Sequence, residues 1–109
     1  MSEIFKPAAG KKKGILFACS LGSVNDVTRM LELGCDPREC NGSGEEAIVI
    51  AARYNSVGCV KKLLEAGVPV NVTSATGNSL KFYAEHHKNR VMLNLIEKYE
   101  AQLNQVNRS

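Results

Sequence analysis

The chain has 109 residues, of which 44% are hydrophobic and 23% are charged. This composition is that of a single globular domain with a modest core, and it excludes a chain that is disordered throughout. The net charge of +3 is too small to indicate nucleic-acid binding by itself, and no apolar stretch approaches the length of about 18 residues that a membrane-spanning helix needs.

Residues 1–12 are predicted to form a disordered basic segment, because Pro7 and Gly10 interrupt it and no apolar periodicity is present. Lys11, Lys12 and Lys13 lie at its end, and the simplest interpretation is a solvated cap over the exposed end of the fold. Contact with an acidic partner surface is the alternative. The apolar residues that follow imitate a secretory signal, but the run is short, and we interpret it as the first helix.

Six helices are predicted from apolar positions that recur at helical spacing, and they fall into three pairs. In the first pair, Ser23 is an N-cap with Asp26 at the third helical position, and Gly34 is a C-terminal stop. Asn41-Gly42, between the first two pairs, is the strongest short turn signal in the chain. We expect the last residues, 105–109, to fray. The predicted helices span 14–21, 24–33, 45–54, 57–66, 79–87 and 89–103, and the connecting arms span 35–44 and 68–77.

The helix pairs repeat with a period of 33 residues. Ala18 matches Ala51 and Ala84, and the glycines that follow the second helices of the first two pairs, Gly34 and Gly67, are also 33 residues apart. A fixed period of this length, with two helices and a glycine-marked turn in each copy, is the sequence signature of a stack of repeats. Because one short pair cannot bury a core alone, three copies are about the minimum for an independent fold.

Three segments resemble the consensus of the ankyrin-repeat family. EAGVPVN (65–71) and LELGCDP (31–37) are similar to its EAGADVN, and GNSLKFYAEHHKN (77–89) is similar to its G-x-TPLHxAxxxGN. The resemblance covers about residues 13–99 and implies an all-α solenoid of three helix-turn-helix repeats joined by β-hairpin-like arms. Its TPLH box is poorly matched, which we expect to affect local stability more than the fold. The implied single domain is 13–104, with repeats at about 13–41, 42–74 and 75–104.

Four cysteines are present, and their spacing matches no usual zinc site. Cys19 and Cys59 occupy core-facing helix positions, where a thiol behaves as a small hydrophobe. Cys35 and Cys40 flank the first arm, so a disulfide across it is the alternative to four free thiols in a reducing compartment. We therefore expect a cytoplasmic protein, with the nucleus as the alternative compartment.

No catalytic motif is visible: the sequence has no glycine-rich phosphate loop, no GxSxG and no HExxH. The only histidines, His86 and His87, are adjacent on a predicted helix and therefore point about 100° apart, which disfavours a two-ligand metal site. We predict no enzymatic activity, no cofactor, no metal and no small-molecule substrate.

The family resemblance implies a partner surface on the concave side of the stack, made of the hairpin tips and the last turn of each first helix. Arg and Tyr at such positions favour binding, because they supply large contact area with polar ends, although solvated helix ends are the simpler interpretation. Phe82 and Tyr83 are instead expected to pack inside the third repeat. By register, the helix positions are Ser20, Leu21, Arg53, Tyr54, His86 and His87, and the tip positions are Asn41, Ser43, Glu45, Ser74, Thr76 and Asn78.

These observations predict a monomeric, non-enzymatic module, an adaptor or inhibitor, that binds another folded protein and not a membrane. One alternative is self-association through apolar side chains near the start of the stack, Ile4, Phe5 and Ile15. Another is binding to nucleic acid or to an acidic surface through lysines that do not obviously share one face: Lys6, Lys11, Lys12, Lys13, Lys61, Lys62 and Lys81.

Overall fold

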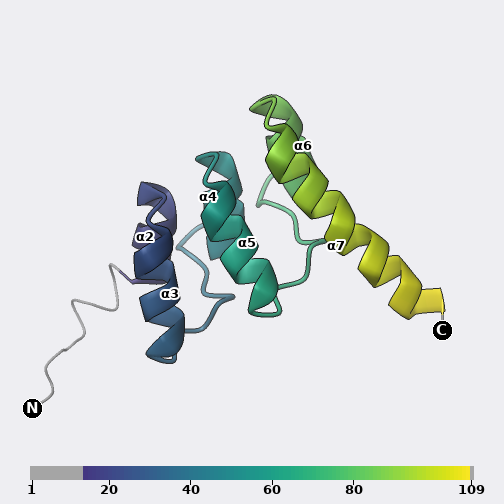
Figure 1. Ribbon diagram of the computed structural model, residues 1–109. Coiled ribbons are helices and arrows are strands. Elements are labelled where there is room, and N and C mark those ends of the chain that lie inside the picture. Colours follow the sequence, from purple (N-terminus) through teal and green to yellow (C-terminus); the bar gives the residue numbers. More distant parts are fainter. Residues whose placement is uncertain (1–13, 109) are drawn as a thin grey trace, which may run out of the picture.

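The computed structural model describes the backbone of residues 14–108 and the side chains of residues 14–103 (Figure 1). Over this range the chain is all-α, as predicted, with six helices and no strand. The predicted disorder of residues 1–12 lies outside the described residues. The helices are α2 (Ile15–Leu21), α3 (Val24–Glu32), α4 (Ala47–Arg53), α5 (Val57–Glu65), α6 (Leu80–His86) and α7 (Arg90–Arg108).

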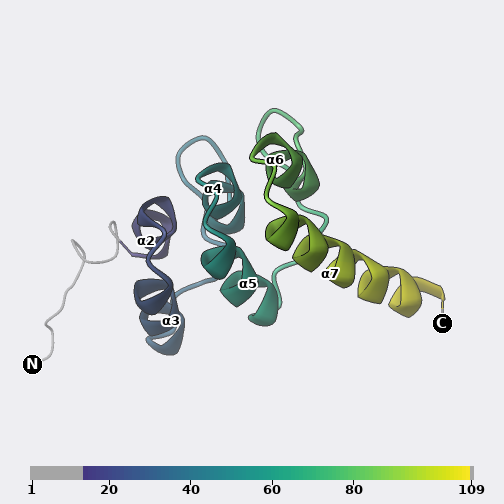
Figure 2. The ribbon, with the colours of Figure 1, turned by 45° about the horizontal axis from the view of Figure 1, so that its top comes forward.

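The six helices form two layers. The first helices of the pairs, α2, α4 and α6, lie side by side in one layer, and α3, α5 and α7 follow one another in the second (Figures 1 and 2). A short turn joins the two helices of each pair. Successive pairs are joined by an arm that carries one isolated β-bridge, Cys40–Glu46 in the first arm and Thr73–Ser79 in the second. The predicted solenoid of helix-turn-helix repeats is confirmed.

α4 lies at the centre of the stack and is buried along its length. Every residue from Ala47 to Ala52 is buried, because α2 covers one side of the helix and α6 covers the other. These side chains are small or aliphatic, so the neighbouring helices can approach closely. Ile15 on α2 and Leu80 on α6 are fully buried as well, so the expectation that Ile15 leaves apolar surface for self-association is wrong. The core is therefore shared between repeats.

The turns within the three pairs share one backbone conformation. Gly22, Asn55 and Lys88 follow the first helix of each pair, are spaced by 33 residues and have φ angles of 74°, 62° and 55°. Glycine adopts this left-handed conformation without strain and asparagine tolerates it, whereas for lysine it is unfavourable. Asn89 Nδ2 donates a hydrogen bond to Asn55 Oδ1 at 2.7 Å. The second and third turns are therefore held in register by their side chains.

α7 is longer than predicted, while the other helices begin and end within two residues of their predicted bounds. It continues to Arg108, whereas the periodicity predicted an end at Leu103. Gly34 and Gly67, at positive φ, follow α3 and α5, but the residue of the same register in the third repeat is Glu100. Without a glycine to turn the chain, α7 runs on past the stack (Figure 2). No helix within residues 14–108 is long and apolar enough to cross a membrane.

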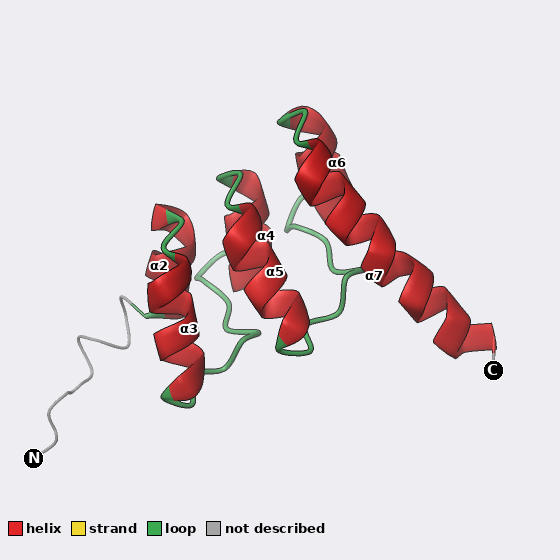
Figure 3. Ribbon diagram, in the orientation of Figure 1, coloured by secondary structure: helices red, strands yellow, loops and turns green. Residues whose placement is uncertain are grey.

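Phe82 does not pack inside the third repeat, so that prediction is wrong, whereas Tyr83 is buried as predicted. Phe82 is 44% exposed although Val49, in the same register of the second repeat, is fully buried. α6 of the third repeat packs against α4, while no described element packs on the outer side of α6 (Figure 3). Its place at the end of the described stack therefore exposes Phe82.

All four cysteines are free, so the alternative disulfide across the first arm is not formed. Cys19 and Cys59 are fully buried, as predicted. A hydrogen bond with Cys59, together with burial, raises the pKa of the Cys19 thiol. This thiol therefore stays protonated and packs as a small hydrophobe.

A substitution at Gly58 tests how closely α5 approaches α3. A Cβ at this position of α5 would overlap Val24 Cγ2 on α3, so Gly58→Ala is expected to lower the free energy of unfolding by about 1–2 kcal/mol. In a Val24→Ala background the overlap is removed, and the same change should raise that free energy by about 0.5–1 kcal/mol through helix propensity. Urea unfolding of the four chains measures both effects. A Gly58→Ala effect of the same sign in both backgrounds would contradict this contact.

Candidate functional site

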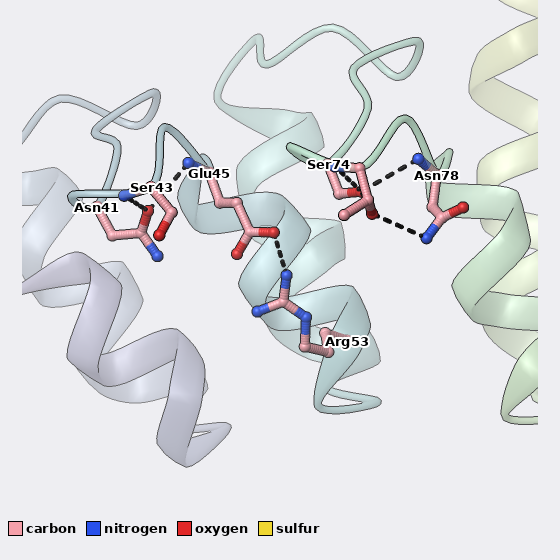
Figure 4. Close-up of polar contacts among 7 residues, drawn as sticks. Asn41, Ser43, Glu45, Arg53, Ser74 and Asn78 are labelled. Carbon is pink, nitrogen blue, oxygen red and sulfur yellow. Dashed lines mark hydrogen bonds and ion pairs between the residues drawn. The ribbon is translucent and has the colours of Figure 1, made fainter.

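The hairpin tips are built by polar side chains that accept backbone hydrogen bonds (Figure 4). In the first arm, Asn41 Oδ1 accepts from the N–H groups of Ser43 and Glu45 at 2.9 and 3.0 Å. In the second arm, Ser74 Oγ accepts the two corresponding bonds at 3.3 and 3.1 Å. Asn and Ser form such turns because their short side chains reach the backbone two residues on. Asn41 and Ser74 therefore shape the tips.

The remaining side chains of the tips are partly engaged with one another. Ser43 and Thr76 are exposed, whereas Ser74 is buried. Thr76 Oγ1 lies 2.9 Å from Ser74 Oγ and accepts a hydrogen bond from Asn78 Nδ2 at 3.1 Å. The second tip is thus fixed by a small network, and Ser43 and Thr76 are the tip residues that face outward.

Glu45 does not lie exposed at a tip, contrary to the prediction. It is 8% exposed, and its carboxylate accepts a hydrogen bond from Arg53 at the other end of α4 (Figure 4). This bond holds the pKa of Glu45 below its ordinary value, against the opposing effect of burial, and it raises the pKa of Arg53. The Arg53 guanidinium carbon also lies 6.0 Å from the centre of the Tyr83 ring on α6. Arg53 therefore bridges the second and third repeats.

The two adjacent histidines have different environments. His87 Nε2 lies 2.7 Å from the backbone carbonyl oxygen of Arg53, and because that oxygen only accepts, Nε2 is the protonated ring nitrogen. His86 is exposed, and its ring stacks on Phe82 with ring centres 6.2 Å apart and ring planes 15° apart. His87 thus links α6 to α4, while His86 faces solvent.

Three large apolar side chains lie exposed on α2 and at the end of α4. Leu21 is 63% exposed, Tyr54 is 57% exposed and Phe17 is 46% exposed. Leu21 and Tyr54 have the same register in neighbouring repeats, and Phe17 lies one helical turn before Leu21 on the same face of α2. We call these three residues the apolar strip. The hydroxyl of the neighbouring Ser20 donates to the Phe17 carbonyl oxygen, one turn earlier on the same helix, at 2.7 Å.

Other titratable side chains of the surface are dispersed. Among residues 14–108, no group of three or more His, Cys, Asp or Glu side chains is placed to hold a metal ion. Two of the lysines considered for nucleic-acid binding are engaged in ion pairs: Lys62 with Glu65 at 3.9 Å and Lys81 with Glu97 at 3.6 Å. The lysines before residue 14 lie outside the described residues.

Comparison with known proteins places this arrangement in a family. A family model described as ankyrin repeats, in three copies, matches residues 15–107. The chain belongs to the ankyrin-repeat family. This match confirms the resemblance seen in the sequence. Ankyrin repeats are in general protein–protein interaction modules.

Two ankyrin-repeat relatives show how far the similarity extends. The chain is similar to the ankyrin repeat protein YahD of Escherichia coli strain K12, with 36% identity over 56 residues, a match that covers 51% of this chain and 28% of that protein. Its fold is similar to that of the human ASB11 ankyrin repeat domain, with a TM-score of 0.73 and 20% identity. That match covers 78% of this chain and 38% of the solved chain. The chain thus spans well under half the length of either relative.

Within this ankyrin array, the predicted contact residues separate into two groups by their environment. Those tied into the fold by hydrogen bonds or ion pairs are Ser20, Asn41, Glu45, Arg53, Ser74, Asn78 and His87. Those that are exposed are Leu21, Ser43, Tyr54, Thr76 and His86, of which Thr76 is also hydrogen-bonded within its tip. Their contact with a partner stays a prediction.

Sequence register missed two exposed aromatic residues, Phe17 and Phe82. A usable signal existed for Phe17, because it precedes Leu21 by four residues and helical side chains at that spacing share a face. The same signal existed for Phe82, which precedes His86 by four residues. For both residues the register position in the second repeat is buried, at Ile50 and Val49.

The Glu45–Arg53 pair predicts a pH-dependent stability. Because the folded-state pKa of Glu45 is lowered, its contribution is fully present above the ordinary Glu pKa of about 4.3 and is lost as the pH falls through the lowered value. At neutral pH, Glu45→Gln should reduce the free energy of unfolding by about 1 kcal/mol, less than for a fully buried pair because Arg53 is partly exposed. The difference from the unmodified chain should shrink in acid.

The measurement is urea unfolding of both chains between neutral and acidic pH. Glu97→Gln is the matched control, because the Lys81–Glu97 pair is exposed on both sides and should contribute little. A stability difference between the unmodified chain and Glu45→Gln that stays constant down to acid would contradict the assigned pKa direction.

Proposed function

We propose that this chain is a non-enzymatic binding module, an adaptor or inhibitor, that acts as a monomer in the cytoplasm. Its partner is another protein, which lies across the apolar strip and the two hairpin tips. The residues that touch the partner are Phe17, Leu21, Ser43, Tyr54, Thr76 and His86, while Arg53, Glu45 and their neighbours hold the surface in shape.

The exposure of the apolar strip carries this proposal. Phe17, Leu21 and Tyr54 come from two neighbouring helices whose other apolar side chains are largely buried. These three side chains are therefore not needed to form the core. Aromatic side chains are enriched in protein interfaces, and Tyr is among the residues that most often supply a large share of the binding energy. Exposed apolar residues in a contiguous group mark such surfaces.

The rigidity of the surrounding surface supports the same function. The tips are fixed by side-chain acceptors at Asn41 and Ser74, and the end of α4 is fixed by the Glu45–Arg53 pair and by His87. A surface that is already ordered loses little conformational entropy when a partner binds, which raises affinity. The chain thus presents a preformed face and needs no chemistry of its own.

A pair of double variants tests the proposal. Leu21→Ala/Tyr54→Ala removes most of the apolar strip, and Leu33→Ala/Val91→Ala removes two equally exposed apolar side chains, 72% and 66% exposed, from the second-helix side of the stack. Because all four residues face solvent, both variants should unfold within about 0.5 kcal/mol of the unmodified chain. Immobilised chains are incubated with cell lysate, and captured proteins are quantified by mass spectrometry.

We expect at least one partner to be captured by the unmodified chain and by Leu33→Ala/Val91→Ala, and to be lost by about tenfold or more with Leu21→Ala/Tyr54→Ala. Partners that are captured equally by all three chains would place the binding surface elsewhere and would overturn the proposal.

A further inference from the structure

Five consecutive residues in each repeat become more positively charged from the first repeat to the third. They form the end of the first helix and the turn in each repeat: Ser20 to Val24, then Arg53 to Val57, then His86 to Arg90. The first of these segments, SLGSV, has no charged residue. The second, RYNSV, has one, Arg53, and Glu45 neutralises it. The third, HHKNR, carries two full positive charges and two histidines. We call His86, His87, Lys88 and Arg90 the basic corner.

No ion pair within the described chain engages Lys88 or Arg90, although the exposed Glu85 lies three residues before Lys88. The ion pairs among side chains 14–103 join Arg38 to Glu46, Arg53 to Glu45, Lys62 to Glu65 and Lys81 to Glu97, and none of them includes Lys88 or Arg90. Both residues are exposed. The corner is therefore available to an anionic group from outside.

The fold disfavours the backbone conformation of Lys88 and the charge of Arg90. Lys88 has a φ of 55°, a left-handed conformation that is unfavourable for a side chain other than Gly or Asn, the residues that the first two repeats place there. Arg90 is the first residue of α7, whose first turn has no acidic residue, and a cation at that end opposes the helix dipole. His86 and Lys88, at and just beyond the C-terminal end of α6, are by contrast in places where the dipole of that helix favours positive charge.

The basic corner is continuous with the apolar strip. Tyr54 and His87 have the same register on neighbouring helices, and His87 Nε2 reaches the backbone of Arg53, the residue before Tyr54. The three turns follow one edge of the stack (Figure 3). Along this edge the surface changes from apolar at the first repeat to basic at the third.

We propose that the partner presents an acidic protein segment, with apolar side chains that contact Leu21 and Tyr54 and Asp or Glu carboxylates that contact Lys88 and Arg90. This inference rests on the proposed function, because it names the chemistry of the partner at the same surface. Charge complementarity fixes the orientation of the segment: its acidic part lies over the turn between α6 and α7, and its apolar part lies over α2 and α4.

The corner variant is Lys88→Gly/Arg90→Val, which restores the residues that the first repeat has in this register, Gly22 and Val24. It relieves the left-handed lysine, so its free energy of unfolding should not fall. The charge-matched control is Lys61→Gln/Lys98→Gln, which removes two exposed cations from α5 and α7 outside the corner. The strip variant is Leu21→Ala/Tyr54→Ala.

The probe is a random peptide library displayed on phage and selected against the intact chain. We expect enriched peptides to combine apolar or aromatic residues with a cluster of Asp and Glu at one end. In fluorescence polarisation, the corner variant should raise their dissociation constants about tenfold, as expected for the loss of two exposed ion pairs. The control should raise them less than about twofold, and the strip variant should abolish binding.

The other outcomes separate this inference from the proposed function. Enriched peptides that need the apolar strip but show no acidic preference would overturn the inference and leave the proposed function standing. Acidic peptides that bind the strip variant as well as the intact chain would overturn the proposed function. A polyuridylate RNA that binds the basic corner more tightly than the selected peptides would overturn the assignment of the occupant to a protein segment.

Discussion

The shortness of the helix pairs is the constraint on which the rest of this structure depends. A pair of helices with seven and nine residues, such as α4 and α5, cannot enclose a core, so each pair is stable only when its neighbours cover both sides. α4 meets this requirement with an unbroken run of buried small and aliphatic residues from Ala47 to Ala52. The exposed candidate contact residues of the second repeat, Ser43 and Tyr54, therefore lie at its hairpin tip and at the end of α4.

The same constraint explains why so much of the fold could be predicted from sequence. Stacked repeats must place equivalent residues at equivalent positions, so a 33-residue period predicts helices, turns and arms together. Gly22, Asn55 and Lys88 show this most clearly, because three different residues adopt one left-handed conformation at matching positions. The end of α7 was mispredicted where the register breaks, since Glu100 occupies the place of Gly34 and Gly67.

The candidate site was less predictable, because its features depend on contacts between distant residues. The repeat register predicted Glu45 as a tip residue, but its carboxylate accepts a hydrogen bond from Arg53, eight residues away at the far end of α4. His87 was expected to face a partner, yet its ring bonds the carbonyl of Arg53 in the preceding repeat. Phe82 is exposed only because no described element covers it. Period alone predicts which residues are equivalent, and it does not predict which of them bond to one another.

These contacts divide the surface between residues that hold it and residues that are free to bind. Arg53, the most attractive predicted contact residue, is tied to Glu45, lies over Tyr83 and supports His87 through its carbonyl. Leu21 and Tyr54 have no comparable role and remain in solvent. Where the chain departs from the preferences of the fold, at Lys88 and Arg90, it does so on the same edge of the stack. A rigid frame with an apolar strip and a basic corner is the outcome.

Unfolding free energies of single variants at Leu21, Tyr54 and Arg53 test this division most directly. Urea unfolding of Leu21→Ala and Tyr54→Ala should match the unmodified chain within about 0.5 kcal/mol, whereas Arg53→Ala should lose about 1–3 kcal/mol, because it leaves the buried Glu45 carboxylate without its partner. Equal losses at all three positions would show that the strip supports the fold as much as Arg53 does, and would contradict the division between residues that hold the surface and residues that are free to bind.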